Sequence, residues 1–307
     1  MSAKVDGWAA SAEFDTILIG SSRMNRQVIP AVFDAAMAEA GHPTRSFNLS
    51  SDGMRPPEDS YVLDRALEER SRPLRLIVAE VNPIDLRVPE NDLGTDRVVF
   101  WHDTARLRSL WARVWSHSGN KEPTLSRRLS DTWRNLRYFS PHAQYWVMNG
   151  VRSGIGADTL TDELGVTPDD RDESEDLGPR NDGFNGADED DETMTARELR
   201  GFEKARKAMA AGRRLIYGDD ASQAELARKA RLARRHGARL VLIAPPAMNV
   251  EVIKPALGVD AVFLDFSDPK KFPELFRPEL RRDAGHLNTE GSILYTKLLV
   301  RHLAEAL

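Results

Sequence analysis

Short apolar runs alternate with longer amphipathic stretches along the chain. Apolar runs that are rich in β-branched residues and stop at polar, glycine-bearing turns are typical of buried strands. Five runs of this kind predict strands over residues 15–19, 44–49, 74–79, 239–244 and 261–265. Apolar residues at helical spacing predict helices over residues 28–40, 56–70, 195–217 and 221–236, and in the segment that ends at Leu307.

The order of these elements predicts the fold class. Strands separated by helices need crossover connections, which make the strands parallel and place helices on both faces of the sheet. We therefore predict an α/β fold, a three-layer flavodoxin-like sandwich with a central parallel sheet of about five strands. A chain of 307 residues is long enough to form such a fold, and residues 1–307 are interpreted as a single domain.

Two stretches depart from the alternation. Residues 1–14 are expected to have low order, and residues 86–150 predict a helical insertion. The insertion carries five of the six tryptophans, at positions 101, 111, 115, 133 and 146. Large aromatic side chains are usually buried, so we expect these residues to pack the insertion against the main sheet. The alternative is that some of them line the wall of a cleft.

The formal net charge of −5 is unevenly distributed. Residues 158–192 contain 15 acidic residues and two arginines, and this dense charge of one sign predicts a mobile acidic loop. A calcium-binding loop is the alternative, but the spacing of an EF-hand is absent. In segments 195–217 and 221–236, basic residues alternate with Glu and Ala, which favours exposed helix faces over a nucleic-acid site.

Composition restricts the chemistry that the chain can perform. There is no cysteine, which excludes disulfides, thiolate zinc sites and cysteine nucleophiles. The seven histidines show no metal-ligand spacing, so we expect neither a metal nor a cofactor. Without a long apolar run or a recognisable signal peptide, we expect no membrane span and, for the chain as given, a cytoplasmic location. An extracytoplasmic location is the alternative if a leader precedes this sequence.

The first strand ends at a turn that is a candidate for nucleophilic chemistry. Gly20-Ser21-Ser22-Arg23 follows the apolar run and precedes a helical pattern. In a parallel sheet this turn lies at the carboxyl end of the strand, where ligands gather, and its serine faces the positive end of a helix dipole. Ser22 is the candidate nucleophile. The alternative is that Ser21 or Ser22 only caps the helix.

A histidine and a carboxylate lie three positions apart near the other end of the chain. Asp283-Ala-Gly-His286 precedes the terminal helix, which Asn288 or Thr289 can cap. In the predicted topology this loop emerges at the same sheet edge as Ser22. His286 can therefore act as the base for Ser22, with Asp283 holding the imidazole in the useful tautomer.

Several blocks of the sequence resemble those of the SGNH (GDSL-like) hydrolase superfamily. Gly20-Ser21-Ser22 resembles its Gly-Asp-Ser block, Asn48-Leu-Ser-Ser-Asp-Gly53 its second block, and Asp283-Ala-Gly-His286 its last. The resemblance implies a catalytic triad of Ser22, His286 and Asp283. It also implies an oxyanion hole formed by the Ser22 and Gly53 N–H groups and the Asn82 side-chain amide.

Two blocks depart from the family pattern. The third block reads Gly-x-Asn-Asp in the family but Glu80-Val-Asn-Pro83 here, and Ser21 replaces the aspartate before the nucleophile. Ser21, Arg23 and Glu80 are possible supporting residues. Glu80 is left open as a buried structural carboxylate, an acid of perturbed pKa or a substrate contact. This Gly-Ser-Ser-Arg branch resembles proteins that attach acyl groups to cell-envelope polysaccharides.

Three functions are consistent with these residues. The first is a serine hydrolase that cleaves an ester of a carbohydrate, a lipid or a small molecule through an acyl-enzyme. The second is an O-acyltransferase in which the hydroxyl of a cell-envelope polysaccharide replaces water. The third is a non-catalytic carbohydrate-binding protein on the same fold. The expected partner is a small-molecule or glycan ester rather than a nucleic acid.

Overall fold

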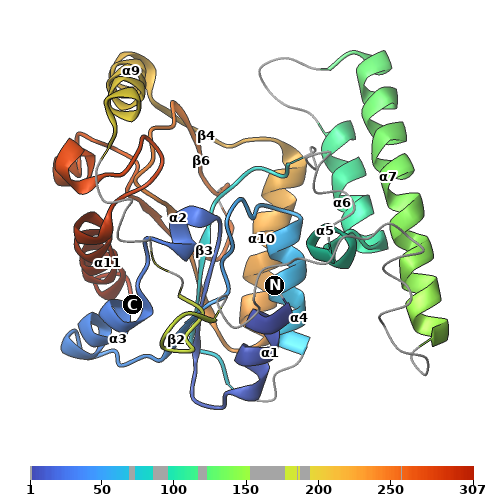
Figure 1. Ribbon diagram of the computed structural model, residues 1–307, viewed down its shortest axis with the longest axis horizontal. Helices are drawn as coiled ribbons and strands as arrows, with labels where there is room; N and C mark the ends of the chain where they lie inside the picture. The colour runs from blue at the N-terminus through green and yellow to red at the C-terminus, as the bar shows by residue number, and fades with distance from the viewer. Residues whose placement is uncertain are drawn as a thin grey trace.

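The computed structural model describes residues 2–68, 73–85, 96–116, 123–152, 177–184, 186, 194–256 and 258–307. A parallel sheet of five strands lies at the centre of the molecule, in the order β2-β1-β3-β5-β7 (Figure 1). The strands are β1 (Thr16–Ile19), β2 (Ser46–Asn48), β3 (Leu76–Glu80), β5 (Arg239–Ala244) and β7 (Val262–Asp265). Each overlaps one of the five predicted runs, so the prediction of an α/β fold with a parallel sheet of about five strands is confirmed.

The strand order reverses direction beside β1. The chain passes from β1 to β2 at one edge and then crosses to β3 on the other side of β1. Leu18 of β1 pairs with Asn48 of β2 and with Val78 of β3. The carboxyl ends of these three strands therefore meet at the point of reversal, where doubly wound folds bind their ligands.

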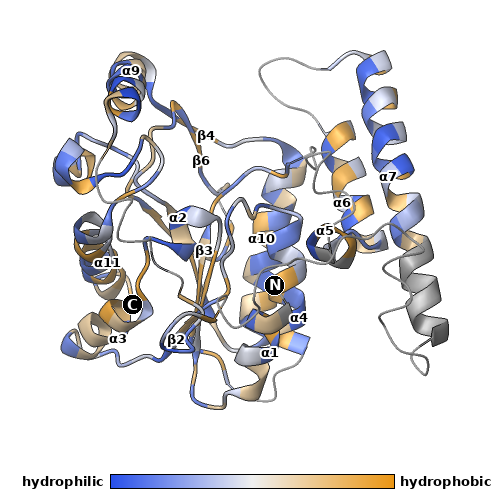
Figure 2. Cartoon of the chain, in the orientation of Figure 1, coloured by the Kyte–Doolittle hydropathy of each residue, from blue (hydrophilic) through white to orange (hydrophobic). Residues whose placement is uncertain are grey.

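Helices cover both faces of the sheet and complete a three-layer sandwich. Figure 1 shows α3 (Pro30–Glu39) and α11 (Thr289–Ala304) on one face, with α1 (Ser2–Ala10), α4 (Glu58–Glu68) and α10 (Asp220–Arg235) on the other. Successive strand residues face opposite layers. Ile17 and Ile19 join the core under α1, α4 and α10, whereas Leu18 joins the core under α3 and α11. Figure 2 shows that the strands are hydrophobic, as burial on both faces requires.

The N-terminal segment is ordered, so the prediction of low order over residues 1–14 is wrong. Within it, α1 packs beside α4, and the ring N–H of Trp8 donates to the carbonyl of Ala66 at 2.9 Å. Lys4 is buried and its ammonium donates to the Asn25 side chain and to the carbonyls of Ser50 and Gly183. These partners are distant in sequence, and their contacts stabilise a helix whose own pattern is weak.

The described part of the insertion is helical. It contains α5 (Asp96–Trp101), α6 (Thr104–Trp115) and α7 (Leu125–Arg152). α6 packs against α10 and α7 packs against α6, so α7 lies outside the sandwich (Figure 1). Trp101 is buried, but Trp115 and Trp133 are 46% and 67% exposed. The expectation that the tryptophans pack against the sheet is therefore wrong for Trp115 and Trp133, because α10 lies between α6, which ends at Trp115, and the sheet, and α7, which carries Trp133, packs outside α6. The side chain of Trp146 lies outside the described residues.

Part of the acidic segment packs on the edge of the sheet. Of residues 158–192, the structure describes 177–184 and Gly186. Asn48 of β2 donates its N–H to the carbonyl of Asp182 at 2.8 Å, and Asp182 is buried. Gly183 has a positive φ, and a Cβ there would lie 2.2 Å from the Asn48 carbonyl oxygen. For residues 177–184 the prediction of a mobile loop is wrong, because the backbone protects the sheet edge. The other residues of the segment lie outside the described ranges.

A second, small parallel sheet was not predicted. The predicted helix over 195–217 ends early as α9 (Ala196–Gly212), and β4 (Arg214–Ile216) then pairs with β6 (Glu251–Ile253). After β7, two short 3₁₀ helices, η4 (Pro273–Phe276) and η5 (Pro278–Leu280), lead toward α11. Among the described residues, no helix has the length and apolar character needed to cross a membrane.

Candidate active site

The turn after β1 places Ser22 at the start of a four-residue helix, α2 (Ser22–Asn25). Ser21 is the N-cap, and its side-chain oxygen accepts the N–H of Arg23 at 3.4 Å. Capping is therefore performed by Ser21. The side chain of Ser22 instead lies against the C-terminal part of the chain, with Oγ 2.7 Å from Nε2 of His286.

Gly20 allows this turn to pass close to the end of β3. A Cβ at position 20 would lie 2.4 Å from Cγ of Met24 and 2.6 Å from Cβ of Glu80. Both distances are shorter than real Cβ contacts, so a side chain here would displace the turn. The glycine before the serine pair is therefore required by packing.

His286 and Asp283 form the other half of the site. Nδ1 of His286 lies 2.8 Å from Oδ2 of Asp283, and Oδ1 also accepts the backbone N–H groups of Gly285 and His286. Burial disfavours the charged carboxylate, but the hydrogen bonds and charge of His286 outweigh it and lower the pKa of Asp283 to about 2. An ionised carboxylate only accepts hydrogen bonds, so Nδ1 of His286 carries a proton, and in the uncharged imidazole this tautomer leaves Nε2 to accept a proton from Ser22.

Arg281 stabilises the loop that contains Asp283 and His286. This role of Arg281 was not predicted from the sequence. Its side chain is 0% exposed. The guanidinium donates to the carbonyls of Leu275, Pro246, Ala284 and Asp283 at 2.8 to 3.2 Å. Burial lowers the pKa of Arg281 to about 10, and the guanidinium lies over the ring of Phe276. In the sequence, Arg281 is one of two adjacent arginines, a pattern typical of an exposed loop.

The loop is closed at its base by local structure. Arg281 and Leu287 form an antiparallel bridge on either side of the Asp283 to His286 segment. Asn288 caps α11, its side-chain oxygen accepting the N–H of Gly291 at 2.9 Å. Asn288 was one of the two predicted caps. A bridged and capped loop holds His286 in a fixed position relative to the sheet.

The three predicted oxyanion donors lie at the carboxyl ends of neighbouring strands. Ser22 begins α2, where the first helical N–H groups have no acceptor within the helix. Gly53 follows β2 at a φ of 72°, in a loop tied to the nucleophile turn by the Ser51 N–H, which donates to the Gly20 carbonyl at 3.2 Å. Asn82 follows β3, and among the described residues its buried Nδ2 has no hydrogen-bond partner. An unpaired buried donor is costly to folding, and this one lies on the cavity wall.

Glu80 supports the nucleophile turn. Its Oε2 accepts both the N–H and the Oγ–H of Ser21 at 2.7 Å, and its Oε1 lies 3.5 Å from a guanidinium nitrogen of Arg23. The side chain is buried. Of the three readings that the sequence left open for Glu80, this geometry fits the structural carboxylate, because Glu80 is closed off from solvent and holds the two neighbours of Ser22.

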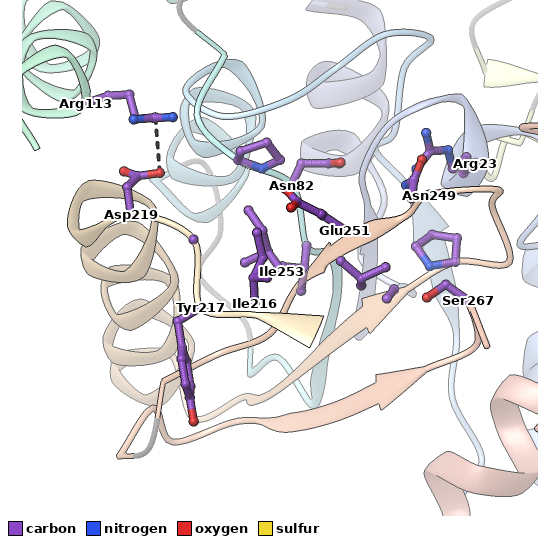
Figure 3. Close-up of a pocket in the computed structure, with 16 residues that line it drawn as sticks. Arg23, Asn82, Arg113, Ile216, Tyr217, Asp219, Asn249, Glu251, Ile253 and Ser267 are labelled. Atoms are coloured by element: carbon purple, nitrogen blue, oxygen red, sulfur yellow. Dashed lines mark ion pairs between the residues drawn. The ribbon is translucent and has the colours of Figure 1, made fainter. Parts of the chain in front are cut away.

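A cavity of about 630 Å³ lies next to the turn, lined by Arg23 and Asn82 but not by Ser22 or His286. Figure 3 shows Arg23 and Asn82 on its wall together with residues of the small β4–β6 sheet. Sequence reasoning missed this cavity because neither β4 nor β6 was predicted. No group of three or more potential metal ligands lies together among the described residues.

No family model matches the chain, and no curated protein matches it.

Proposed function

We propose that the protein is a serine hydrolase that cleaves an ester of a carbohydrate, a lipid or a small molecule. The observation that carries this proposal is the continuous chain from Asp283 through His286 to Ser22. The two links measure 2.8 Å and 2.7 Å. The chain lies at the sheet edge where doubly wound folds bind ligands, and it leads from a half-buried carboxylate to a serine hydroxyl.

In the first half of the reaction, Ser22 Oγ attacks the ester carbonyl while His286 Nε2 takes up the hydroxyl proton. Asp283 stabilises the imidazolium that forms. As the tetrahedral intermediate collapses, His286 returns the proton to the departing alcohol, and an acyl group remains on Ser22. In the second half, His286 takes a proton from water, the acyl-enzyme is hydrolysed and Ser22 is regenerated.

The negative charge on the carbonyl oxygen needs donors that are already in place. The Ser22 and Gly53 N–H groups and the Asn82 amide are the proposed donors. Each donor of this kind typically contributes about 3 kcal/mol to the stability of the transition state. The unpartnered Nδ2 of Asn82 supports this role, since the donor is left available in the resting protein.

We further propose that the chain is a member of the SGNH (GDSL-like) superfamily, in a Gly-Ser-Ser-Arg branch. The strand order supports this proposal, as do the positions of the sequence blocks after β1, β2 and β3 and before α11. The departures at Ser21 and Glu80 are mutually consistent, because Glu80 accepts two hydrogen bonds from Ser21.

An O-acyltransferase is the second candidate. The cavity beside Arg23 and Asn82 favours it, because a volume of about 630 Å³ can receive an alcohol that competes with water for the acyl-enzyme. A cell-envelope polysaccharide is the proposed acceptor in that case. A non-catalytic carbohydrate-binding role becomes the leading proposal if Ser22 proves unreactive.

Turnover of para-nitrophenyl acetate tests the function. We expect a burst of nitrophenol close to one equivalent per active site, followed by slower turnover, with both lost in Ser22→Ala and His286→Ala. Adding a soluble sugar or glycerol then separates the candidates: a transferase yields an acylated alcohol, whereas a hydrolase yields acetate. Equal turnover by wild type and a folded Ser22→Ala variant would contradict the proposal.

A further inference from the structure

Arg23, the residue directly after the proposed nucleophile Ser22, lines the cavity with its side chain (Figure 3). Arg23 belongs to α2, and its side chain is 18% exposed. Within the described residues, its guanidinium makes one ion pair, at 3.5 Å to Glu80, and no hydrogen bond. A guanidinium has five N–H donors, and donors that are largely removed from water without acceptors are costly.

Glu80 does not satisfy these donors. Its Oε2 is occupied by the N–H and the hydroxyl of Ser21, and its Oε1, which faces Arg23 at 3.5 Å, is buried and forms no hydrogen bond among the described residues. The carboxylate is therefore held in place 3.5 Å from Arg23, balancing its charge without forming the fork of two short bonds that an arginine–carboxylate pair prefers. The guanidinium keeps donors free for a group in the cavity.

The other charged side chains of the cavity have partners. Arg113, at the opposite end in Figure 3, lies 3.1 Å from Asp219. Glu251 also lines the cavity, and its carboxylate is paired with Arg214. Among the charged residues that line the cavity, Arg23 is thus the one whose guanidinium is held only by a long contact.

Neutral amides also line the cavity. Nδ2 of Asn82 is buried and has no partner among the described residues, and Asn249 is a second amide on the cavity wall (Figure 3). The small sheet contributes apolar side chains to the lining, namely Ile216, Val252 and Ile253. A cavity lined by a guanidinium, two amides and an apolar surface suits a ligand with an anionic end and an uncharged body.

We propose that the ester substrate carries a carboxylate or phosphate group and that Arg23 binds this group in the cavity. The inference rests on the proposed esterase function, since Arg23 acts on a substrate that Ser22 attacks. Arg23 is then a specificity residue. The anion of the substrate forms a bidentate pair with its guanidinium, which also keeps its contact with Glu80.

Two matched pairs of esters test the proposal. The first pair is para-nitrophenyl acetate and its ring-carboxylated analogue, which places the anion on the alcohol. The second is para-nitrophenyl hexanoate and mono-para-nitrophenyl adipate, which places it on the acyl chain. Each ester is assayed with wild type, Arg23→Met and Arg23→Lys. Arg206→Met is the control, since it removes the same charge from an exposed arginine of α9 that pairs with Glu203.

The anionic ester of one pair is expected to have the higher kcat/KM. Arg23→Met should lower that value about tenfold or more beyond any loss for the neutral ester, mainly through KM. A loss shared by both esters reflects the contact of Arg23 with the buried Glu80. The kcat/KM of Arg23→Lys for the anionic ester should fall between the values of the wild type and Arg23→Met, because lysine keeps the positive charge but cannot form a bidentate pair. Arg206→Met should behave as wild type. Equal loss for neutral and anionic esters in Arg23→Met would overturn the proposal and make Arg23 a positioning residue of the nucleophile turn.

A binding measurement separates this inference from the proposed function. Ser22→Ala protein is titrated calorimetrically with both esters of each pair. Tighter binding of the anionic ester of one pair, abolished in the Ser22→Ala, Arg23→Met double variant, supports the anion site whether or not the wild type turns over esters. Equal binding of the anionic and neutral esters in both pairs overturns it. Failure of the function is seen separately, as a wild-type protein that releases no nitrophenol.

Discussion

Ser22 Oγ lies 2.7 Å from Nε2 of His286, although 264 positions separate the two residues in the chain. The packing of the first crossover helix on the last helix holds them together. Thr296 of α11 donates its hydroxyl to the carbonyl of Gln27 at 3.1 Å and accepts the N–H of Ile29 at 3.2 Å, just before α3. The serine and the histidine are thus positioned by one helix layer, which couples the geometry of the site to the core under α3 and α11.

Replacing Asn82 with alanine is expected to reduce turnover without unfolding the protein. Its Nδ2 has no partner in the resting structure, so its removal breaks no hydrogen bond of the fold. Loss of one oxyanion donor typically lowers kcat about 100-fold or more. Ester turnover and thermal unfolding of Asn82→Ala measure the two effects. Unchanged turnover, or a loss of activity that only follows a loss of stability, would contradict the oxyanion role.

Replacing Arg281 with methionine is expected to impair both stability and turnover. The change leaves four carbonyls without their guanidinium donor, and we expect a loss of about 3 kcal/mol or more in the free energy of unfolding. Turnover by the remaining folded protein should also fall, because two of those carbonyls belong to Asp283 and Ala284. Urea unfolding and active-site titration measure these effects. The exposed Arg277→Met is the matched control, and full activity in folded Arg281→Met would refute the positioning role.

A buried histidine pair predicts acid sensitivity in the insertion. Nδ1 of His102, at the end of α5, lies 2.8 Å from Nδ1 of His142 in α7. Burial, with a smaller contribution from the charge of His142, lowers the pKa of His102 to about 3. In the folded protein His102 stays neutral, whereas the unfolded chain binds a proton below about pH 6.5. The stability linked to His102 is therefore complete above that pH and lost as the pH falls toward about 3.

Urea unfolding across this range tests the histidine pair. Each pH unit below about 6.5 should remove up to about 1.4 kcal/mol from the free energy of unfolding. His102→Phe should flatten this dependence, since the phenyl ring cannot titrate and meets the rings of Trp101 and Phe139. His42→Gln, in the turn after α3, serves as the control and should keep the wild-type slope. An unchanged slope in His102→Phe would show that other groups cause the loss.

The strands β1, β3 and β5 could be predicted because each is a short apolar run that is buried in the sheet and ends at a polar turn. The edge strands β2 and β7 were identified from their place in the alternation of strands and helices. The turn at Ser22 and the Asp283 to His286 segment could be identified for a related reason, since a parallel sheet brings strand ends to one edge. The strands β1, β3 and β5 and these two segments could be located from local sequence patterns alone. The side chains of Ser22 and His286 are in contact, as the parallel topology predicts.

Features that depend on distant partners could not be predicted. The helix over Ser2–Ala10 is held by Lys4 and Trp8, whose partners lie from 21 to 179 positions away. The strands β4 and β6 have three residues each, too few to show a period of two. The role of Arg281 depends on carbonyls that no side-chain pattern marks.

Glu80 shows the same limit at the site itself. Its sequence position after an apolar run is compatible with an exposed strand end or a buried one. Only the fold brings it to Ser21 and Arg23. The two hydrogen bonds from Ser21 then explain why a serine is suited to the position before the nucleophile, because both its N–H and its hydroxyl find an acceptor in Glu80.

The activation of Ser22 is tested most directly by covalent labelling with a fluorophosphonate probe, measured by intact mass and located by peptide mapping. We expect the wild type to take up one label on Ser22, and folded Ser22→Ala and His286→Ala variants to take up none. A folded wild type that stays unlabelled under conditions that label a control serine hydrolase would contradict an activated Ser22, as would labelling that persists in Ser22→Ala.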